Sequence, residues 1–232
     1  MLSILWLTGC GKPEKEVNPQ FLIKTPLIEI SSSEFAEELD LKKAAYPYDI
    51  KENQKEYNEM VIHLVKILSE EIVLLSAAAD KQIIITDQEI TSAEKEFKKD
   101  YPEDSFEQIL LENAISYPLW KERFKKNMIM EKLIDQELKQ KIIITPEDIV
   151  EFYNIHNVKT TQNSDNSAMI LNKIKNEKEL VTRLRLQKTQ ENYDQWIQNL
   201  YKMYPVEINK DKLKVFLLDV NKNKEDKNAK EN

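Results

Sequence analysis

The sequence predicts a mostly α-helical fold with a small β pairing between two segments near its ends. Three observations predict it. The only glycines among the 232 residues are Gly9 and Gly11, so neither glycine-rich phosphate loops nor primed hairpin turns are available after position 11. Several long stretches repeat apolar residues at helical spacing. Short strand-like segments remain only at residues 27–30 and 206–208.

A helix-start pattern occurs twice, in residues 83–90 and 142–149. In each copy three isoleucines lead to a threonine, and an acidic residue three positions later can complete a capping box. The two pairs are Thr86–Glu89 and Thr145–Asp148. Such a cap contributes about 1 kcal/mol. We therefore interpret the two patterns as corners that redirect the chain and not as sites of chemical activity.

The first half of the chain is expected to contain a strand and four helices. After the strand at residues 27–30, Ser31 and Glu34 have capping-box spacing and precede a short helix over residues 34–43. The apolar stripe of residues 54–79 predicts a helix about 40 Å long. Two shorter helices follow the first corner, and Pro102 separates them.

The second half is expected to contain two long helices. Ser116 is the expected cap of a helix whose stripe ends at Leu138, and a further helical turn or two follows the second corner. Residues 157–167 are rich in Asn, Thr and Ser and predict a loop, after which a long helix ends before Pro205. We expect residues 206–208 to pair with 27–30, and residues 215–220 to add an extended piece.

The amino-terminal residues predict a lipid anchor. Leu7-Thr8-Gly9-Cys10 resembles the lipobox of bacterial lipoproteins, although no basic residue precedes the apolar run. The resemblance implies a signal peptide over residues 1–9, cleavage before Cys10 and diacylglyceryl attachment to its sulfur. Residues 10–24 would then form a lipidated tether. The alternative is a chance hydrophobic terminus with a buried thiol.

Four segments together resemble the SurA N-terminal domain of the SurA-like and PrsA-like periplasmic chaperones. Residues 110–124 resemble its central helix–turn–helix, with Ala114 where the family usually has glycine. The two corners resemble its helix starts, and residues 188–208 resemble its final helix and strand. The resemblance covers most of residues 25–210 and implies one chaperone domain over residues 25–220. Residues 221–232, rich in Lys, Asn and Glu, are expected to be a disordered tail.

The resemblance also implies what the chain does and where. SurA-like proteins bind unfolded exported polypeptides outside the cytoplasm, and many carry a parvulin prolyl isomerase domain. Such a domain would fall within residues 154–179, an interval too short for an independently folded unit. The expectation is a chaperone module without the isomerase, lipid-anchored on the periplasmic face of the bacterial envelope. Because Gly11 follows Cys10 in place of an acidic residue, the outer membrane is favoured over the inner.

Composition argues against catalytic, metal and nucleic-acid chemistry. The net charge of −7 disfavours nucleic acid, because no basic face could release phosphate counterions. A single cysteine and two histidines leave little for a metal site, and the serines at 31–33 have no nearby histidine to activate them. We expect no cofactor, no nucleotide and no enzymatic activity. A residual prolyl isomerase is the enzymatic alternative.

The candidate client-binding residues are aromatic and methionine side chains on the two long helices of the second half. Flexible Met and flat aromatic rings suit contacts with varied apolar segments. The competing interpretation is that they form the core, since a stripe at helical spacing is usually buried. The candidates are Tyr117, Trp120, Phe124, Met128 and Met130 on the first helix, and Tyr193, Trp196 and Tyr201 on the second.

The sequence therefore predicts an ATP-independent extracytoplasmic chaperone that shields unfolded exported or outer-membrane proteins. The alternative from another class is a non-catalytic envelope adaptor that holds one folded partner. Exposure of the aromatic set would favour the chaperone, and its complete burial would favour the adaptor.

Overall fold

The computed structural model describes residues 21–102, 105–156 and 167–219. Over these residues the fold is mostly helical with a small antiparallel sheet, as predicted. Cys10, the signal peptide, residues 11–20 of the tether, most of the predicted loop at 157–167 and the tail at 221–232 lie outside the described residues. In chain order the elements are β1 (Phe21–Lys24), β2 (Glu29–Ser31), α1 (Ser32–Lys43), the 3-10 helix η1 (Ile50–Glu52), α2 (Gln54–Asp80), α3 (Asp87–Lys98), α4 (Ser105–Glu112), α5 (Tyr117–Glu137), the 3-10 helix η2 (Lys139–Lys141), α6 (Pro146–His156), α7 (Ser167–Met203), β3 (Glu207–Ile208) and α8 (Lys210–Lys214).

The sheet corrects two predictions. Its order is β2-β1-β3, so β3 pairs with β1 and not with residues 27–30. Residues 21–24, predicted to end the tether, form the central strand, with Ile23 opposite both Ile30 and Ile208. Phe21, Leu22 and Ile23 are all buried. A strand buried on both faces shows no alternation of apolar and polar residues. Three apolar residues are also too few for periodicity to reveal the strand.

A turn fixed by Thr25 separates β1 from β2. The Thr25 backbone N–H donates to Ile28 O at 2.8 Å, and the Ile28 backbone N–H donates to Thr25 Oγ1 at 3.0 Å. The same hydroxyl lies 2.7 Å from Ser76 Oγ on α2. The hairpin is thereby hydrogen-bonded to α2, since buried hydroxyls require partners.

The two ends of the described chain meet in the first of two core clusters, as the sequence predicted, but not through an extended carboxyl-terminal piece. Residues 215–217 form turns after α8, and the side chains of Phe216, Leu217 and Leu218 pack against this core. Phe216 contacts Phe35 edge to face, with ring centroids 4.9 Å apart. The Asn58 side chain both donates to Leu218 O and accepts from Leu218 N, each at 2.8 Å. The predicted extended segment is therefore wrong over these residues, because their apolar side chains gain more by folding back onto α1 and α2.

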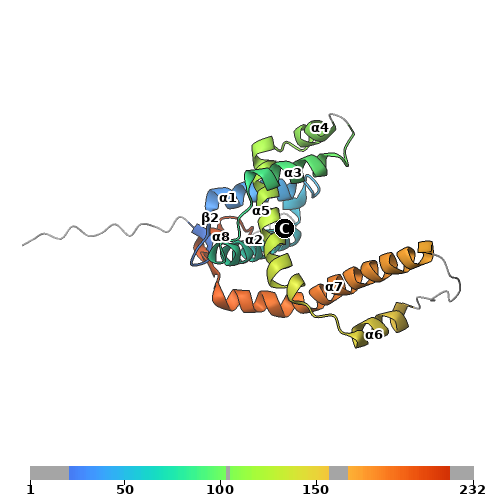
Figure 1. Ribbon diagram of the computed structural model, residues 1–232. Coiled ribbons are helices and arrows are strands. Elements are labelled where there is room, and N and C mark those ends of the chain that lie inside the picture. The colour runs from blue at the N-terminus through green and yellow to red at the C-terminus, as the bar shows by residue number, and fades with distance from the viewer. Residues whose placement is uncertain (1–20, 103–104, 157–166, 220–232) are drawn as a thin grey trace, which may run out of the picture.

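Helix α2 runs through both core clusters. Its first half packs under the sheet and α1, and its second half packs against α5 and α7 through residues such as Val73, Ala77, Leu133 and Leu200. Figure 1 shows the arrangement that results: α5 crosses α2, with α3 and α4 at one end, and α6 with the start of α7 extends away from the other.

Both corners and two further helix starts form as predicted. Ser31 with Glu34 and Thr86 with Glu89 make capping boxes, and Ser116 accepts from the Leu119 backbone N–H. At the second corner, the Thr145 backbone N–H donates to Asp148 Oδ2 at 2.8 Å, and the Asp148 N–H donates to Thr145 Oγ1 at 3.3 Å. Local sequence alone is sufficient for these caps.

Two helices end on a left-handed residue that is not glycine. Ala114 has φ 53° and Gln82 has φ 55°. After each, the hydrogen bonds of a Schellman motif close the helix: Ile115 N–H donates to Leu110 O, and Ile83 N–H donates to Ala78 O, both at 2.9 Å. Ala114 thus adopts the left-handed conformation that glycine takes most readily.

We expect Ala114→Gly and Gln82→Gly each to raise the free energy of unfolding by about 1 kcal/mol, because glycine has no Cβ to clash in the left-handed region. Urea denaturation of each variant measures it. Ala44→Gly is the control, since Ala44 has φ −58° at the end of α1. There glycine should be neutral or destabilising, and stabilisation at all three positions would contradict the explanation.

Candidate functional site

The predicted aromatic and methionine set does not form one surface. The structure divides it among three places: an aromatic cluster at the amino-terminal end of α5, the core between α2, α5 and α7, and a groove between α5 and α7. Tyr117 is exposed, and the other seven residues are half-buried.

The aromatic cluster joins α3, α4 and the start of α5, and we call it the aromatic head. Trp120 stacks on Phe124 with ring centroids 4.9 Å apart and meets Phe106 of α4 edge to face at 4.8 Å. Phe97 of α3 contacts both Trp120 and Phe124 at 5.7 Å. Each such pair contributes about 0.5–1.5 kcal/mol beyond its buried area. Three of the predicted residues, Tyr117, Trp120 and Phe124, therefore hold the head together.

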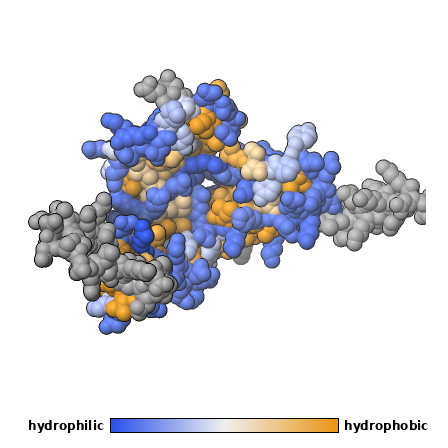
Figure 2. Space-filling model, turned by 90° about the vertical axis from the view of Figure 1, so that its right-hand side faces the viewer, coloured by the Kyte–Doolittle hydropathy of each residue, from blue (hydrophilic) through white to orange (hydrophobic). Residues whose placement is uncertain are grey.

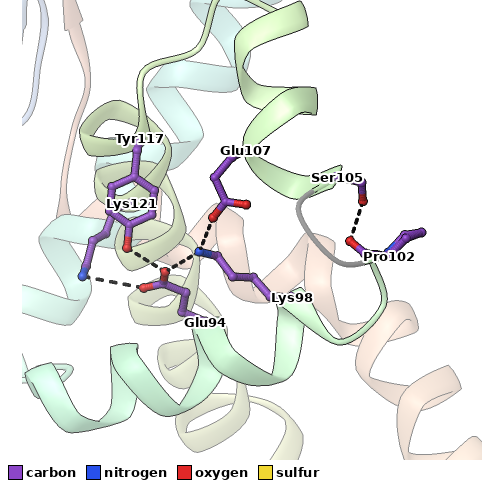
Figure 3. A network of polar contacts seen from close by, with 7 residues as sticks. All are labelled: Glu94, Lys98, Pro102, Ser105, Glu107, Tyr117 and Lys121. Atoms are coloured by element: carbon purple, nitrogen blue, oxygen red, sulfur yellow. Dashed lines mark hydrogen bonds and ion pairs between the residues drawn. The ribbon is translucent and has the colours of Figure 1, made fainter.

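A polar network reinforces the head (Figure 3). The Tyr117 hydroxyl donates to Glu94 at 2.6 Å, and Lys98 lies 3.1 Å from Glu94 and 3.0 Å from Glu107. Lys121 reaches Glu94 at 3.6 Å. Burial raises the pKa of Glu94, but hydrogen bonds from Tyr117 and Lys98 outweigh burial, so the net pKa of this carboxyl is lowered. One carboxylate thereby connects α3 with α5, and Lys98 extends the connection to α4.

The lowered pKa of Glu94 predicts how the head responds to acid. A carboxyl whose folded pKa is lowered contributes stability above its unfolded pKa, and that contribution is lost as pH falls through the folded pKa. Glu94→Gln should cost about 1 kcal/mol at neutral pH and make the loss of stability below about pH 4.5 less steep. Urea unfolding from pH 7 to pH 3 tests this, with Glu96→Gln on the same helix as the control. Equal acid dependence of wild type and Glu94→Gln would contradict it.

Four predicted residues belong to the second core cluster. Met130, Tyr193, Trp196 and Tyr201 pack against α2 and α5 there. The Tyr193 hydroxyl donates to Glu70 at 2.7 Å, and burial followed by the Glu70 hydrogen bond raises the pKa of Tyr193. Burial also raises the pKa of Tyr201. Because the Tyr193 hydroxyl is paired and all four side chains lie against the core, they have a structural role.

Met128 alone of the predicted set lines the groove between α5 and α7. The groove has a volume of about 540 Å³ and takes one wall from the first corner. Its lining consists of four apolar side chains and a polar border, namely Ile85, Met128, Ile134 and Leu186 with Glu131, Lys132, Asp135, Lys139 and Thr189. Leu186 is 53% exposed on α7. The groove combines an apolar floor with charged edges, as binding pockets commonly do.

Two lysines fix the corners that flank this region. Lys132 of α5 donates to Ile84 O at 3.0 Å and to Glu89 at 2.8 Å. The hydrogen bonds that Glu89 accepts from Lys132 and Thr86 lower its pKa to about 2. Lys188 of α7 pairs with Asp148 at 2.7 Å. The corner caps are therefore tied by ion pairs to the two helices that form the groove.

Sequence reasoning missed the isoleucines of the corners as candidates for binding. The middle isoleucine of each triplet is exposed, Ile84 by 69% and Ile143 by 79%. The signal was present in the sequence, because a hydrophobic staple uses one isoleucine before the cap and one within the helix, so each triplet holds more apolar side chains than the cap requires. Figure 2 shows apolar residues in several separate patches on one face, with hydrophilic residues between them.

In the part of the chain that the structure describes, no group of three His, Cys, Asp or Glu side chains is placed to hold a metal ion. No helix in the same ranges has the length and apolarity required to cross a bilayer. No family model matches the chain, and no curated protein is significantly similar to it.

Proposed function

We propose that this protein is an ATP-independent extracytoplasmic chaperone that binds apolar segments of unfolded exported or outer-membrane proteins in the groove between α5 and α7. The observation that carries the proposal is the groove itself, which is open and apolar and has charged borders. The two corners that flank it expose Ile84 and Ile143. Scattered apolar side chains are common on protein surfaces, but apolar side chains in a groove favour a binding site.

The chemistry of the groove suits varied clients. Met128 is unbranched and adapts to different partners, and Leu186 adds aliphatic surface. Lys132 and Lys139 alternate with Glu131 and Asp135 at the border, so a bound chain can place either sign of charge there. The net charge of −7 would help keep a complex with an aggregation-prone chain in solution.

The direct test is suppression of aggregation. An outer-membrane protein diluted from urea should remain in solution when the purified chain is present in several-fold excess, without nucleotide. Light scattering measures the effect, and an equal concentration of an inert acidic protein is the control. Unchanged scattering at every ratio would exclude the proposal.

The proposal places the protein on the periplasmic face of the envelope, anchored through lipidated Cys10, with the outer membrane favoured. Its support is the lipobox-like Leu7-Thr8-Gly9-Cys10. Intact-mass analysis of protein from the membrane fraction should give the mass of a chain that begins at Cys10 and carries lipid. A chain that retains an unmodified Met1 would exclude the anchor.

An adaptor for one folded partner is the second candidate. The observation in its favour is that seven of the eight predicted client-binding side chains pack in the aromatic head or the second core cluster. Capture of one partner at fixed stoichiometry, without unfolded clients, would favour the adaptor. For either function we propose no catalysis, and proline-peptide isomerisation should proceed at the uncatalysed rate.

A further inference from the structure

A second cavity lies between α1, α2 and α5 and shares no lining residue with the groove or the aromatic head. Its volume is about 350 Å³, within the range of small-molecule sites. Helix α2 supplies an apolar wall through Leu64 and Leu68, which are buried, and Ile67 lies at the exposed edge. The wall of the cavity opposite α2 is charged, and the packing of α2 in the two core clusters does not explain that charge.

Three cations converge on this cavity. They are Lys42 from the last turn of α1 and Arg123 and Lys126 from α5, and the carboxylates beside them are Glu38 and Glu71. Among the described residues, cations thus outnumber carboxylates in the lining of a protein whose net charge is −7. A locally positive cavity in an acidic protein favours an anionic occupant.

The cations keep unused capacity. Arg123 is hydrogen-bonded to Glu38, but its Nε is buried without a hydrogen-bond partner in the described part of the chain. Lys126 pairs with Glu122 outside the lining at 3.2 Å and is 3.9 Å from Glu71, the outer limit of an ion pair, so part of its donor capacity remains. Burial raises the pKa of Glu71 even though Lys126 opposes that effect. Lys42 makes no ion pair with any described residue. A buried donor without an acceptor is costly, and a bound anion would offset that cost.

We propose that this cavity binds an amphiphilic anion, a carboxylate carried on a short aliphatic chain. The carboxylate lies among Lys42, Arg123 and Lys126, and the aliphatic chain lies against Leu64 and Leu68. Arginine and lysine suit this role because charge-assisted hydrogen bonds to carboxylates are about twice as strong as neutral ones. The proposal does not depend on the chaperone function.

Such a carboxylate can belong to a fatty acid or to the carboxyl terminus of an apolar peptide. Calorimetric titration of the full chain with sodium octanoate and with N-acetyl-leucine distinguishes these sources. We expect saturable binding of at least one of them, and binding of 1-octanol about ten-fold weaker or undetectable, because it lacks the charge. Equal binding of octanol and octanoate would overturn the proposal, as would absence of binding by both carboxylates.

Adjacent lysines on α5 provide a matched pair of variants. Lys126→Gln should weaken binding about ten-fold, the factor expected for one charge-assisted hydrogen bond. Lys125→Gln removes the same charge from an exposed position outside the cavity and should leave binding unchanged. Circular dichroism checks that both variants fold. Identical affinities of the two variants would place the ligand elsewhere and overturn the assignment.

Discussion

Replacing Ile23 with alanine is expected to lower the free energy of unfolding by about 3 kcal/mol, the usual cost of truncating a fully buried isoleucine. Ile23 is completely buried and pairs with Ile30 on one side and Ile208 on the other. The truncated side chain would leave a cavity at the point where both ends of the described chain meet. Urea denaturation at pH 7 measures the change.

The matched control is Leu27→Ala. Leu27 lies in the turn after β1 and is 54% exposed, so its truncation should cost less than about 0.5 kcal/mol. The comparison also tests the correction to the sequence-based strand pairing. If Leu27→Ala were the more damaging variant, residues 27–30 and not β1 would be central to the sheet.

Placing charge in the groove is expected to abolish most client binding. Met128→Glu combined with Leu186→Glu puts two carboxylates on the apolar floor between α5 and α7. Each apolar side chain contributes about 1.5 kcal/mol or more when a client covers it, so the double variant should need at least about ten times more protein to suppress aggregation. Light scattering with an unfolded outer-membrane protein measures the ratio required.

The control for this experiment adds the same charges outside the groove. Leu27→Glu with Val215→Glu changes two exposed apolar residues, Val215 being 81% exposed after α8. This variant should suppress aggregation as well as wild type does, and circular dichroism should show both double variants folded. Equal activity of the two variants would exclude the groove as the client site.

The sequence was sufficient for features that depend on neighbouring residues. The capping pairs Ser31–Glu34, Thr86–Glu89 and Thr145–Asp148 form as predicted, and α2 matches its expected range to within one residue at its end. A cap needs only a hydroxyl and a carboxylate three positions apart, and a long stripe repeats its periodicity many times. These signals are local, so they can be recognised without knowledge of the rest of the fold.

The candidate site was less predictable. The sequence indicated which helices would carry apolar and aromatic side chains, but not which neighbours would cover them. Trp120 is covered because Phe97 and Phe106 pack against it, while Met128, two turns further along α5, remains in the groove. Coverage depends on how helices from distant parts of the chain meet, and single-sequence periodicity carries no information on that.

The sequence by itself determined the helical class, the corners and the places where helices begin. Only the tertiary structure decided that β1 is the central strand, that the aromatic set divides among three places, and that cations gather between α1, α2 and α5. The physical reason is the separation along the chain of the residues that interact. Caps and helical stripes arise from interactions within a few residues, whereas a short buried strand, a groove or a charged cavity exists only once distant segments pack together.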